Sequence, residues 1–277
     1  MFTRAEVTYD LAEGAVERVL QDEANPLHRI AKMIDDGAMV LDVGAGNGLL
    51  ALVVSRTCKG VVIDGIEPDP YAAAMAKRLY RRFFVGAAED FWTEIEEGGY
   101  NFVVLADVIE HMSDPLGFLE GLNEHLGEDA RILVSVPNVA FASVRISLLN
   151  GQFDYVDSGL LERTHVRFFT LKTIKALAET LGMGIERILF LERDWFSTEI
   201  ALGHLSACPC TILQVARDRT SSTYQFVIAL SKLPAIPVEE HFGAGANHPF
   251  LKYLLQRTYV ESVFHRVFWY LSATRAK

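Results

Sequence analysis

Closely spaced glycines follow the first strongly apolar run of the chain, in the stretch Val40-Leu41-Asp42-Val43-Gly44-Ala45-Gly46-Asn47-Gly48. Glycine lets a backbone turn sharply and approach a ligand without a Cβ in the way. A helix that begins at such a loop presents free N–H groups to a polar ligand. The spacing differs from the G-x-G-x-x-G pattern of dinucleotide sites, because Leu49 stands where the third glycine is expected. Asp42 also suits an ammonium-bearing ligand better than a pyrophosphate. A tight turn without a ligand is the structural alternative.

Another acidic position follows the next apolar run, in Ile63-Asp64-Gly65-Ile66-Glu67-Pro68-Asp69. A carboxylate roughly 20 positions past a glycine loop can hydrogen-bond both hydroxyls of a ribose. Glu67 follows the apolar run directly and is therefore the predicted ribose ligand. Asp64 and Asp69 are interpreted as solvated side chains.

Strand-like and helix-like stretches alternate from Pro26 to about Leu191. The pattern predicts a doubly wound α/β fold, with a mostly parallel, seven-stranded Rossmann-like sheet and an antiparallel edge strand. Right-handed crossovers place the ligand crevice at the carboxyl ends of the strands. The predicted strands are Met39–Val43, Val61–Ile66, Phe83–Val85, Phe102–Leu105 and Ile132–Val136, with Ile185–Leu191 and Tyr224–Leu230 as the antiparallel edge. The predicted helices are Leu49–Thr57, Pro70–Tyr80, Pro115–Leu126 and Leu171–Leu181.

Additions to this core are predicted at both ends and after the fifth strand. Residues 1–25 form an N-terminal helical cap, 26–232 the α/β domain, and 233–277 a linker with a C-terminal helical extension. The excursion at about 138–168 is rich in Asn, Gly, Asp and aromatic residues, and long connections of this kind are often functional lids.

The composition excludes several classes of protein. Half of the residues are hydrophobic, so the chain can bury enough apolar surface to offset its ordering entropy. A net charge of −10 argues against a nucleic-acid partner. Three cysteines cannot form a disulfide framework, which favours a reducing compartment. No signal peptide or run of about 18 apolar residues is visible, and the predicted location is cytoplasmic.

Further motifs give these features a family resemblance. They are Ala106-Asp107-Val108-Ile109-Glu110-His111-Met112-Ser113-Asp114-Pro115, Val134-Ser135-Val136-Pro137-Asn138, Phe153-Asp154-Tyr155 and Leu161-Glu162-Arg163-Thr164-His165-Val166-Arg167-Phe168-Phe169-Thr170. With the glycine loop, they resemble class I S-adenosylmethionine-dependent methyltransferases over about residues 26–232. The last two motifs are similar to a bacterial branch often associated with glycan or cell-surface polysaccharide synthesis.

The resemblance implies a binding site for S-adenosyl-L-methionine. The methionine end would be held at the first strand, the ribose by Glu67, and the adenine beside Pro68 and the loop that contains Ala88 and Glu89. The family often has Asp where Ala87 stands here, so adenine recognition would depend on Glu89 or backbone groups. Asp107 would lie near the sulfonium, where its negative charge favours the cation. The residues implied at the methionine end are Asp42, Gly44, Ala45, Gly46 and Gly48.

Methyl transfer to a hydroxyl also needs a proton acceptor, for which histidine is suited near neutral pH. His165 and His111 are therefore candidate catalytic residues beside Asp107, with a structural role as the alternative for each histidine. Tyr155, Arg163 and Arg167 are the predicted acceptor-binding residues, and the arginines suit an acceptor that carries carboxylate or phosphate.

Metal-free transfer is predicted. Asp107 and Asn138 lack a convincing third ligand for a hard cation. His204 with Cys208-Pro209-Cys210 lacks a fourth ligand for zinc.

The predicted reaction is O-methylation of a sugar, a glycan or another small polar acceptor. A quinone precursor, an amine or a protein acceptor is the first alternative, and a catalytically silent cofactor-binding or assembly module is the second. Aromatic and basic residues are interleaved over His248–Lys277. They predict a helix that packs on the domain, forms a homodimer, or contacts a membrane surface.

Overall fold

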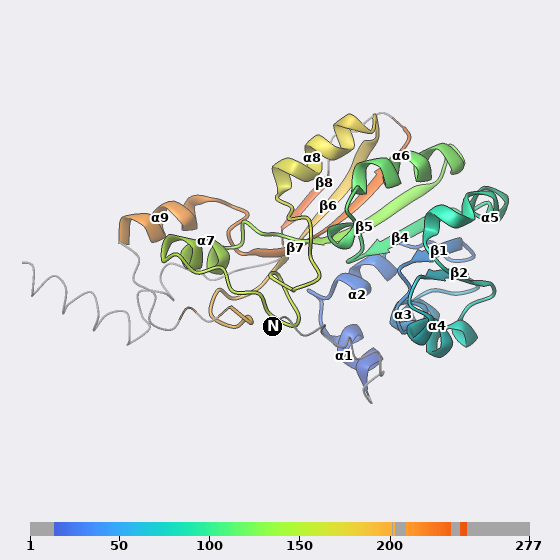
Figure 1. Cartoon of the computed structure of the whole chain (residues 1–277), viewed down its shortest axis with the longest axis horizontal. Helices are drawn as coiled ribbons and strands as arrows, with labels where there is room; N and C mark the ends of the chain where they lie inside the picture. The colour runs from blue at the N-terminus through green and yellow to red at the C-terminus, as the bar shows by residue number, and fades with distance from the viewer. Residues whose placement is uncertain (1–13, 201, 203–208, 234–238, 243–277) are drawn as a thin grey trace, which may run out of the picture.

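An eight-stranded mixed sheet forms the centre of the molecule (Figure 1). The computed structural model describes residues 14–200, 202, 209–233 and 239–242. The strands are β1 (Met39–Val43), β2 (Val62–Glu67), β3 (Phe83–Val85), β4 (Phe102–Ala106), β5 (Arg131–Pro137), β6 (Gly184–Glu192), β7 (Thr223–Ser231) and β8 (Glu239–Phe242).

Helices of moderate length connect the strands. The α-helices are α1 (Ala15–Gln21), α2 (Pro26–Ala31), α3 (Leu49–Thr57), α4 (Pro70–Ala76), α5 (Trp92–Gly98), α6 (Pro115–His125), α7 (Ala142–Leu149), α8 (Leu171–Thr180) and α9 (Pro209–Arg217). Three single 3-10 turns are η1 (Lys77–Leu79), η2 (Ala88–Phe91) and η3 (Ile109–His111).

The strand order is β3-β2-β1-β4-β5-β7-β6-β8. The strands from β3 to β5 are parallel, and β7 is antiparallel to both β5 and β6. The chain runs outward from β1 to β3 and then returns to place β4 on the other side of β1. In sheets of this type ligands bind where the strand order reverses, which here is at the carboxyl ends of β1 and β4.

The predicted doubly wound class is confirmed, and two details of the sheet differ from the expectation. The antiparallel strand β7 lies inside the sheet rather than at its edge, and β8 adds an eighth strand parallel to β6. The position of β7 between β5 and β6 is favourable because its apolar residues are buried on both faces of the sheet. A run that is apolar on both faces does not show from sequence alone which neighbours it pairs with.

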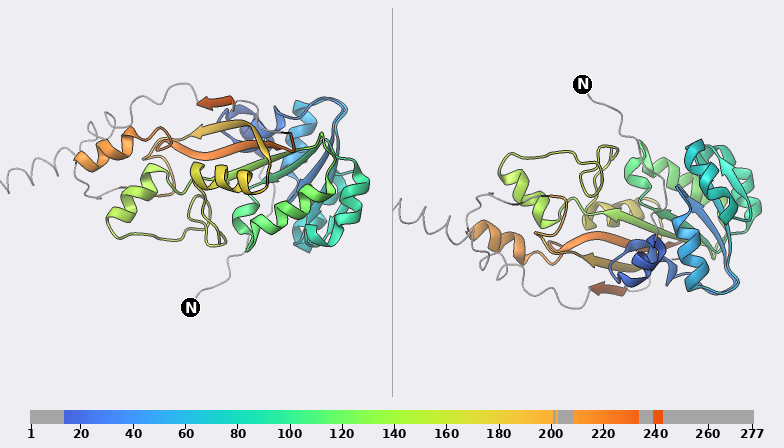
Figure 2. Two further views of the ribbon diagram at one scale, coloured as in Figure 1. Left: turned by 90° about the horizontal axis from the view of Figure 1, so that it is seen from above. Right: turned by 90° about the horizontal axis from the view of Figure 1, so that it is seen from below.

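Helices cover both faces of the sheet, as the edge-on views show (Figure 2). One core lies between the sheet and α5, α6 and α8, with Leu119, Leu122 and Ile174 among its buried residues. The other lies between the sheet and α1 to α4, with Ile30 and Val53 at its centre. This two-sided burial explains why β4 reads as a continuous apolar run and why most residues of β1 and β5 are apolar.

Several helices begin at side-chain caps that the sequence supplies. Asn25, Asp69 and Asp114 accept backbone N–H groups at the starts of α2, α4 and α6, and a proline follows each of them. Thr170 and Thr173 cap α8 reciprocally. Such caps satisfy N–H groups that have no partner inside the helix, and proline fits the first helical position because its missing N–H is not needed there.

A smaller apolar cluster holds the excursion after β5. It contains Phe141 and Val144 near α7, Leu160 and Leu161 from the following loop, and Trp195. Part of the predicted lid region is therefore helical, because α7 lies within it. None of the helices within the described ranges combines the length and apolar character needed to cross a bilayer.

Asp64 is a correction to the sequence interpretation, because it is fully buried rather than solvated. Its carboxylate accepts hydrogen bonds from Arg81 at 2.6 Å, from Arg82 at 2.9 Å and from Tyr100 at 2.8 Å. Burial alone would raise the pKa of Asp64, but these donors lower it to about 2. The network joins β2 to the segment that leads into β3.

We expect Asp64→Asn to lower the free energy of unfolding by about 2 kcal/mol at pH 7. The folded-state pKa of Asp64 lies below the ordinary value of 3.8, so its contribution is present above pH 3.8 and is lost as the pH falls through about 2. Urea unfolding of both proteins at pH 7 and at pH 2.5 measures this difference. A loss of equal size at both pH values would contradict an ionic origin.

Candidate functional site

The glycine loop closes against the neighbouring strand and against the segment after β4. The amides of Gly44 and Ala45 donate to the Ile66 carbonyl at 2.9 and 3.0 Å. Gly44 has a φ of 71°, and a Cβ at this position would lie 2.8 Å from Cγ2 of Val108. A side chain at Gly44 would therefore be strained and would also collide with Val108.

Glu67 lies at the end of β2 beside this loop and is 5% exposed. One carboxylate oxygen accepts from the Gly46 amide at 2.7 Å, and the other accepts from the Asp69 amide at 2.8 Å. Two backbone amides thus hold the carboxylate next to the glycine loop. This arrangement fits a ribose ligand, and the role of Glu67 in binding stays a prediction.

Asp42 is buried at the end of β1, where the Tyr80 hydroxyl donates to its carboxylate at 2.6 Å. Burial raises the pKa of Asp42 to about 7, and the nearby charge of Glu67 adds to the increase. A buried carboxylate with one neutral donor is a favourable partner for a cation such as an ammonium group. Tyr80 is distant in sequence, so sequence reasoning did not find it.

The adenine side of the predicted site is more open. Ala88 is buried in η2, whereas Pro68 and Glu89 are exposed. The Gly86 amide donates to the Glu67 carbonyl at 3.2 Å and brings this loop next to the end of β2. The structure therefore places the predicted adenine and ribose residues side by side.

Asp107 follows β4 and is the one non-glycine residue with positive φ, at 57°, within the described ranges. Its amide donates to the Ser135 hydroxyl at 3.0 Å, and that hydroxyl donates to the Asp107 carboxylate at 2.9 Å. The Gln225 side chain on β7 donates to the same carboxylate oxygen. Asp107 as a whole residue is exposed, yet partial removal of its carboxyl group from water raises the pKa of that group. A strained residue held by three contacts at a ligand crevice is typical of a functional position.

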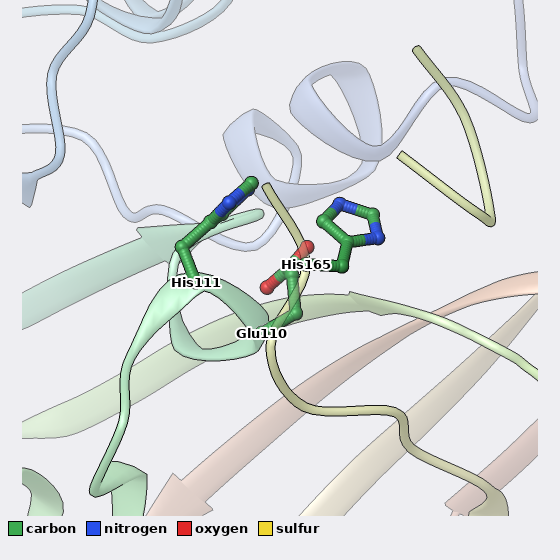
Figure 3. Close-up of side chains that lie close together, drawn as sticks. All are labelled: Glu110, His111 and His165. Atoms are coloured by element: carbon green, nitrogen blue, oxygen red, sulfur yellow. The ribbon is translucent and has the colours of Figure 1, made fainter. Parts of the chain in front are cut away.

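Glu110, His111 and His165 form a cluster (Figure 3). Glu110 and His111 come from η3, and His165 comes from the loop before α8. The two imidazole rings meet edge to face at 4.8 Å, and Figure 3 shows the Glu110 carboxylate between them. Burial lowers the pKa of His165, and the neighbouring His111 lowers it further. Burial raises the pKa of Glu110 well above its ordinary value, and Asp107 adds to the increase.

The predicted histidines are therefore brought together, with His165 buried and His111 exposed. Sequence reasoning missed Glu110, although it stands in the quoted motif directly before His111. The signal available was the Glu-His pair after a parallel strand, but nothing in the sequence shows that the Glu110 side chain turns inward.

The predicted acceptor-binding residues line the loop that precedes α8. Tyr155 is 47% exposed and meets Phe153 edge to face. Arg163 pairs with Asp157 at 2.9 Å, an exposed pair that contributes little to stability. Arg167 donates to the Ser113 carbonyl and ties this loop to the segment after β4. The contacts of these three side chains are with different partners, and none of them joins one of the three to another.

Asn138 is not positioned as a metal ligand. It is fully buried, its amide nitrogen donates to the carbonyls of Thr220 at 3.1 Å and Thr223 at 2.8 Å, and its side-chain oxygen accepts from Ala140. The candidate zinc residues His204 and Cys208 lie outside the described residues, as do residues 248–277 with their predicted helix.

Several known methyltransferases are similar to this chain in sequence or in fold. A ubiquinone biosynthesis O-methyltransferase of Xanthomonas campestris is 25% identical over 127 residues, which are 44% of this chain and 53% of that protein. A probable (S)-tetrahydroprotoberberine N-methyltransferase of Papaver bracteatum is 27% identical over 137 residues, which are 48% of this chain and 36% of that protein. The chain thus spans about half or less of the length of these relatives.

A crystal structure of a SAM-dependent methyltransferase from Archaeoglobus fulgidus has the same fold, with a TM-score of 0.55. The two chains are 16% identical, and the match covers 76% of this chain and 92% of the other.

The fold is that of the class I S-adenosylmethionine-dependent methyltransferases. Residues 16–187 match the family model described as a methyltransferase domain, and the chain belongs to this family. S-adenosyl-L-methionine is the cofactor of the class. The residues present fit it, because a Cβ at Gly46 would meet only a backbone oxygen at 4.0 Å, the buried Glu67 carboxylate accepts from the amide of that glycine, and the buried carboxylate of Asp42 precedes the loop.

Proposed function

We propose that the protein transfers the methyl group of S-adenosylmethionine to an oxygen of a sugar or another small polar acceptor. In this reaction the acceptor oxygen bonds to the methyl carbon, the carbon–sulfur bond breaks, and the acceptor loses its proton. The observation that carries the proposal is the Glu110, His111 and His165 cluster, which lies beside Asp107 at the carboxyl end of β4.

A hydroxyl acceptor accounts for this cluster better than an amine does. A hydroxyl must lose its proton as it reacts, and imidazole and carboxylate groups can take that proton. Arg163 and Arg167 add positive charge nearby and support an acceptor that carries carboxylate or phosphate. The exposed rings of Phe153 and Tyr155 offer an apolar surface to a ring-shaped acceptor. In this proposal, the excursion at about residues 138–168 is the lid over the acceptor.

A quinone precursor is the second candidate acceptor. The similarity to ubiquinone biosynthesis O-methyltransferases favours it, and the same cluster would serve a phenolic hydroxyl. Both candidates predict an O-methyl product, so the product separates them from an amine acceptor.

The test uses the full chain with radiolabelled S-adenosylmethionine and a panel of acceptors. The panel contains sugars and nucleotide sugars, phenolic quinone precursors, and amines. We expect label on a hydroxyl-bearing acceptor, and we expect His165→Gln to lower the rate by roughly 100-fold or more. Transfer to amines alone would contradict O-methylation. Tight cofactor binding with no transfer to any acceptor would instead support a catalytically silent module.

A further inference from the structure

Three side chains that commonly bind metal ions meet at the carboxyl end of β4. Glu110, His111 and His165 can each offer one ligand atom, and these atoms lie within 4.8 Å of one another. Ligand atoms around one tetrahedral zinc ion lie about 3.4 Å apart, given metal–ligand distances of about 2.0–2.2 Å. Side-chain movements of about an ångström would therefore bring the three into one coordination sphere.

The state of Glu110 is the second observation. This side chain is 1% exposed, and neither of its carboxylate oxygens has a hydrogen-bond partner within the part of the chain that the structure describes. Burying a carboxylate without a partner is costly, so such groups pair or bind metal ions in native proteins. Asp107 and Glu162 lie close enough to act electrostatically on Glu110, and they increase the attraction of the site for a cation.

The backbone already orients both imidazoles. Nδ1 of His111 lies 3.3 Å from the Thr164 carbonyl, and Nδ1 of His165 lies 3.2 Å from the Leu160 carbonyl. A carbonyl only accepts hydrogen bonds, so each Nδ1 is the donor and each Nε2 keeps its lone pair. Metal-binding histidines show this pattern, in which the second ring nitrogen is fixed by a hydrogen bond.

We propose that Glu110, His111 and His165 form a binding site for a divalent transition-metal ion such as Zn²⁺. Two imidazoles with one carboxylate suit zinc, cobalt, manganese, iron or nickel, whereas Mg²⁺ and Ca²⁺ prefer oxygen ligands alone. This inference departs from the metal-free reaction that the sequence led us to predict.

The metal would also connect two separate segments. Glu110 and His111 belong to η3, and His165 belongs to the loop before α8, whose amides at Val166 and Arg167 donate to the Glu110 carbonyl at 2.9 and 3.0 Å. Three protein ligands leave a coordination position open for water or, if the proposed function holds, for an oxygen of the acceptor.

Metal binding is tested on the full chain, freed of metal with a chelator that is then removed. Zn²⁺ is titrated by calorimetry, and Co²⁺ is titrated by its visible absorption, which also reports coordination geometry. We expect one ion per chain in each titration. Glu110→Gln and His111→Gln should each weaken binding by at least roughly 10- to 100-fold, the effect known for the outer partners of metal ligands. His111 is exposed, so its variant retains the fold even if a change at Glu110 perturbs the interior.

His125→Gln is the matched control. His125 hydrogen-bonds the Gly121 carbonyl through Nδ1 at 2.8 Å and stacks on Trp92, outside the cluster. Its variant should bind metal as the wild type does. Absence of stoichiometric Zn²⁺ and Co²⁺ binding by the wild type would overturn the proposal. Binding that is unchanged in both cluster variants would also overturn it, since the ion would then lie elsewhere. Neither readout requires methyl transfer, and S-adenosylhomocysteine binding, measured in parallel, reports the cofactor site separately.

Discussion

Asp42→Asn is expected to weaken binding of S-adenosylmethionine by about 10- to 100-fold, because a hydrogen bond to a charged group contributes about 1.5–3 kcal/mol. The ammonium group of the cofactor would lose its carboxylate partner, while the Tyr80 hydroxyl could still donate to the asparagine oxygen. Calorimetry with the cofactor and with S-adenosylhomocysteine measures the loss. Asp129→Asn removes one negative charge from an exposed position and is the control.

Asp42→Asn is also expected to stabilise the protein when no cofactor is bound. Burial raises the pKa of Asp42 to about 7, so ionisation of this group opposes folding at higher pH. Because the pKa of Asp42 is higher in the folded protein than in the unfolded chain, its contribution to the free energy of unfolding is complete below pH 3.8. That contribution is lost as the pH rises through about 7. That difference in pKa corresponds to about 4 kcal/mol, which Asp42→Asn would recover at pH 8.

The wild-type cofactor affinity should fall as the pH is lowered through 7, because the neutral carboxyl of Asp42 binds an ammonium poorly. Glu67 also lies near Asp42, and Glu67→Gln would shift this midpoint downward by removing a neighbouring charge. Equal cofactor affinity of wild type and Asp42→Asn across this range would show that Asp42 does not bind the ammonium group.

Gly65→Ala is expected to lower the free energy of unfolding by about 1–3 kcal/mol, the usual cost of overpacking a core. Gly65 lies in β2 between Asp42 on β1 and Phe83 on β3. An added Cβ would lie 2.7 Å from the Phe83 ring and 3.0 Å from the Tyr80 ring. The displaced Tyr80 is the residue that holds Asp42, so cofactor affinity should fall as well.

Gly127→Ala is the matched control for this change, because a Cβ there meets no atom within 4 Å. Urea unfolding should show this control to be as stable as the wild type or slightly more stable. Combining Gly65→Ala with Phe83→Leu should recover part of the loss, since the smaller side chain yields space. Additive effects of the two substitutions would contradict a steric origin.

The local sequence pattern was sufficient to predict the elements nearest the predicted cofactor site. The glycine loop at 44–48 and the alternation of apolar runs with amphipathic helices depend on neighbouring residues, and the structure has these elements where they were expected. The position of Glu67 at the end of β2 could also be predicted from local pattern, because a carboxylate at the end of a buried strand lies at the carboxyl edge of the sheet. The prediction that Asp64 is solvated was wrong, because its partners Arg81 and Arg82 come from a different segment of the chain.

The amino-acid order by itself determined the fold class and the position of the glycine loop predicted to bind the cofactor, since strand period, turn residues and caps act over a few neighbouring positions. The family followed from the resemblance of its motifs. Only the tertiary structure decided which distant groups meet: Tyr80 with Asp42, Gln225 with Asp107, and His165 with Glu110. These contacts span tens of residues and form when the crossovers pack on the sheet, so no local pattern encodes them.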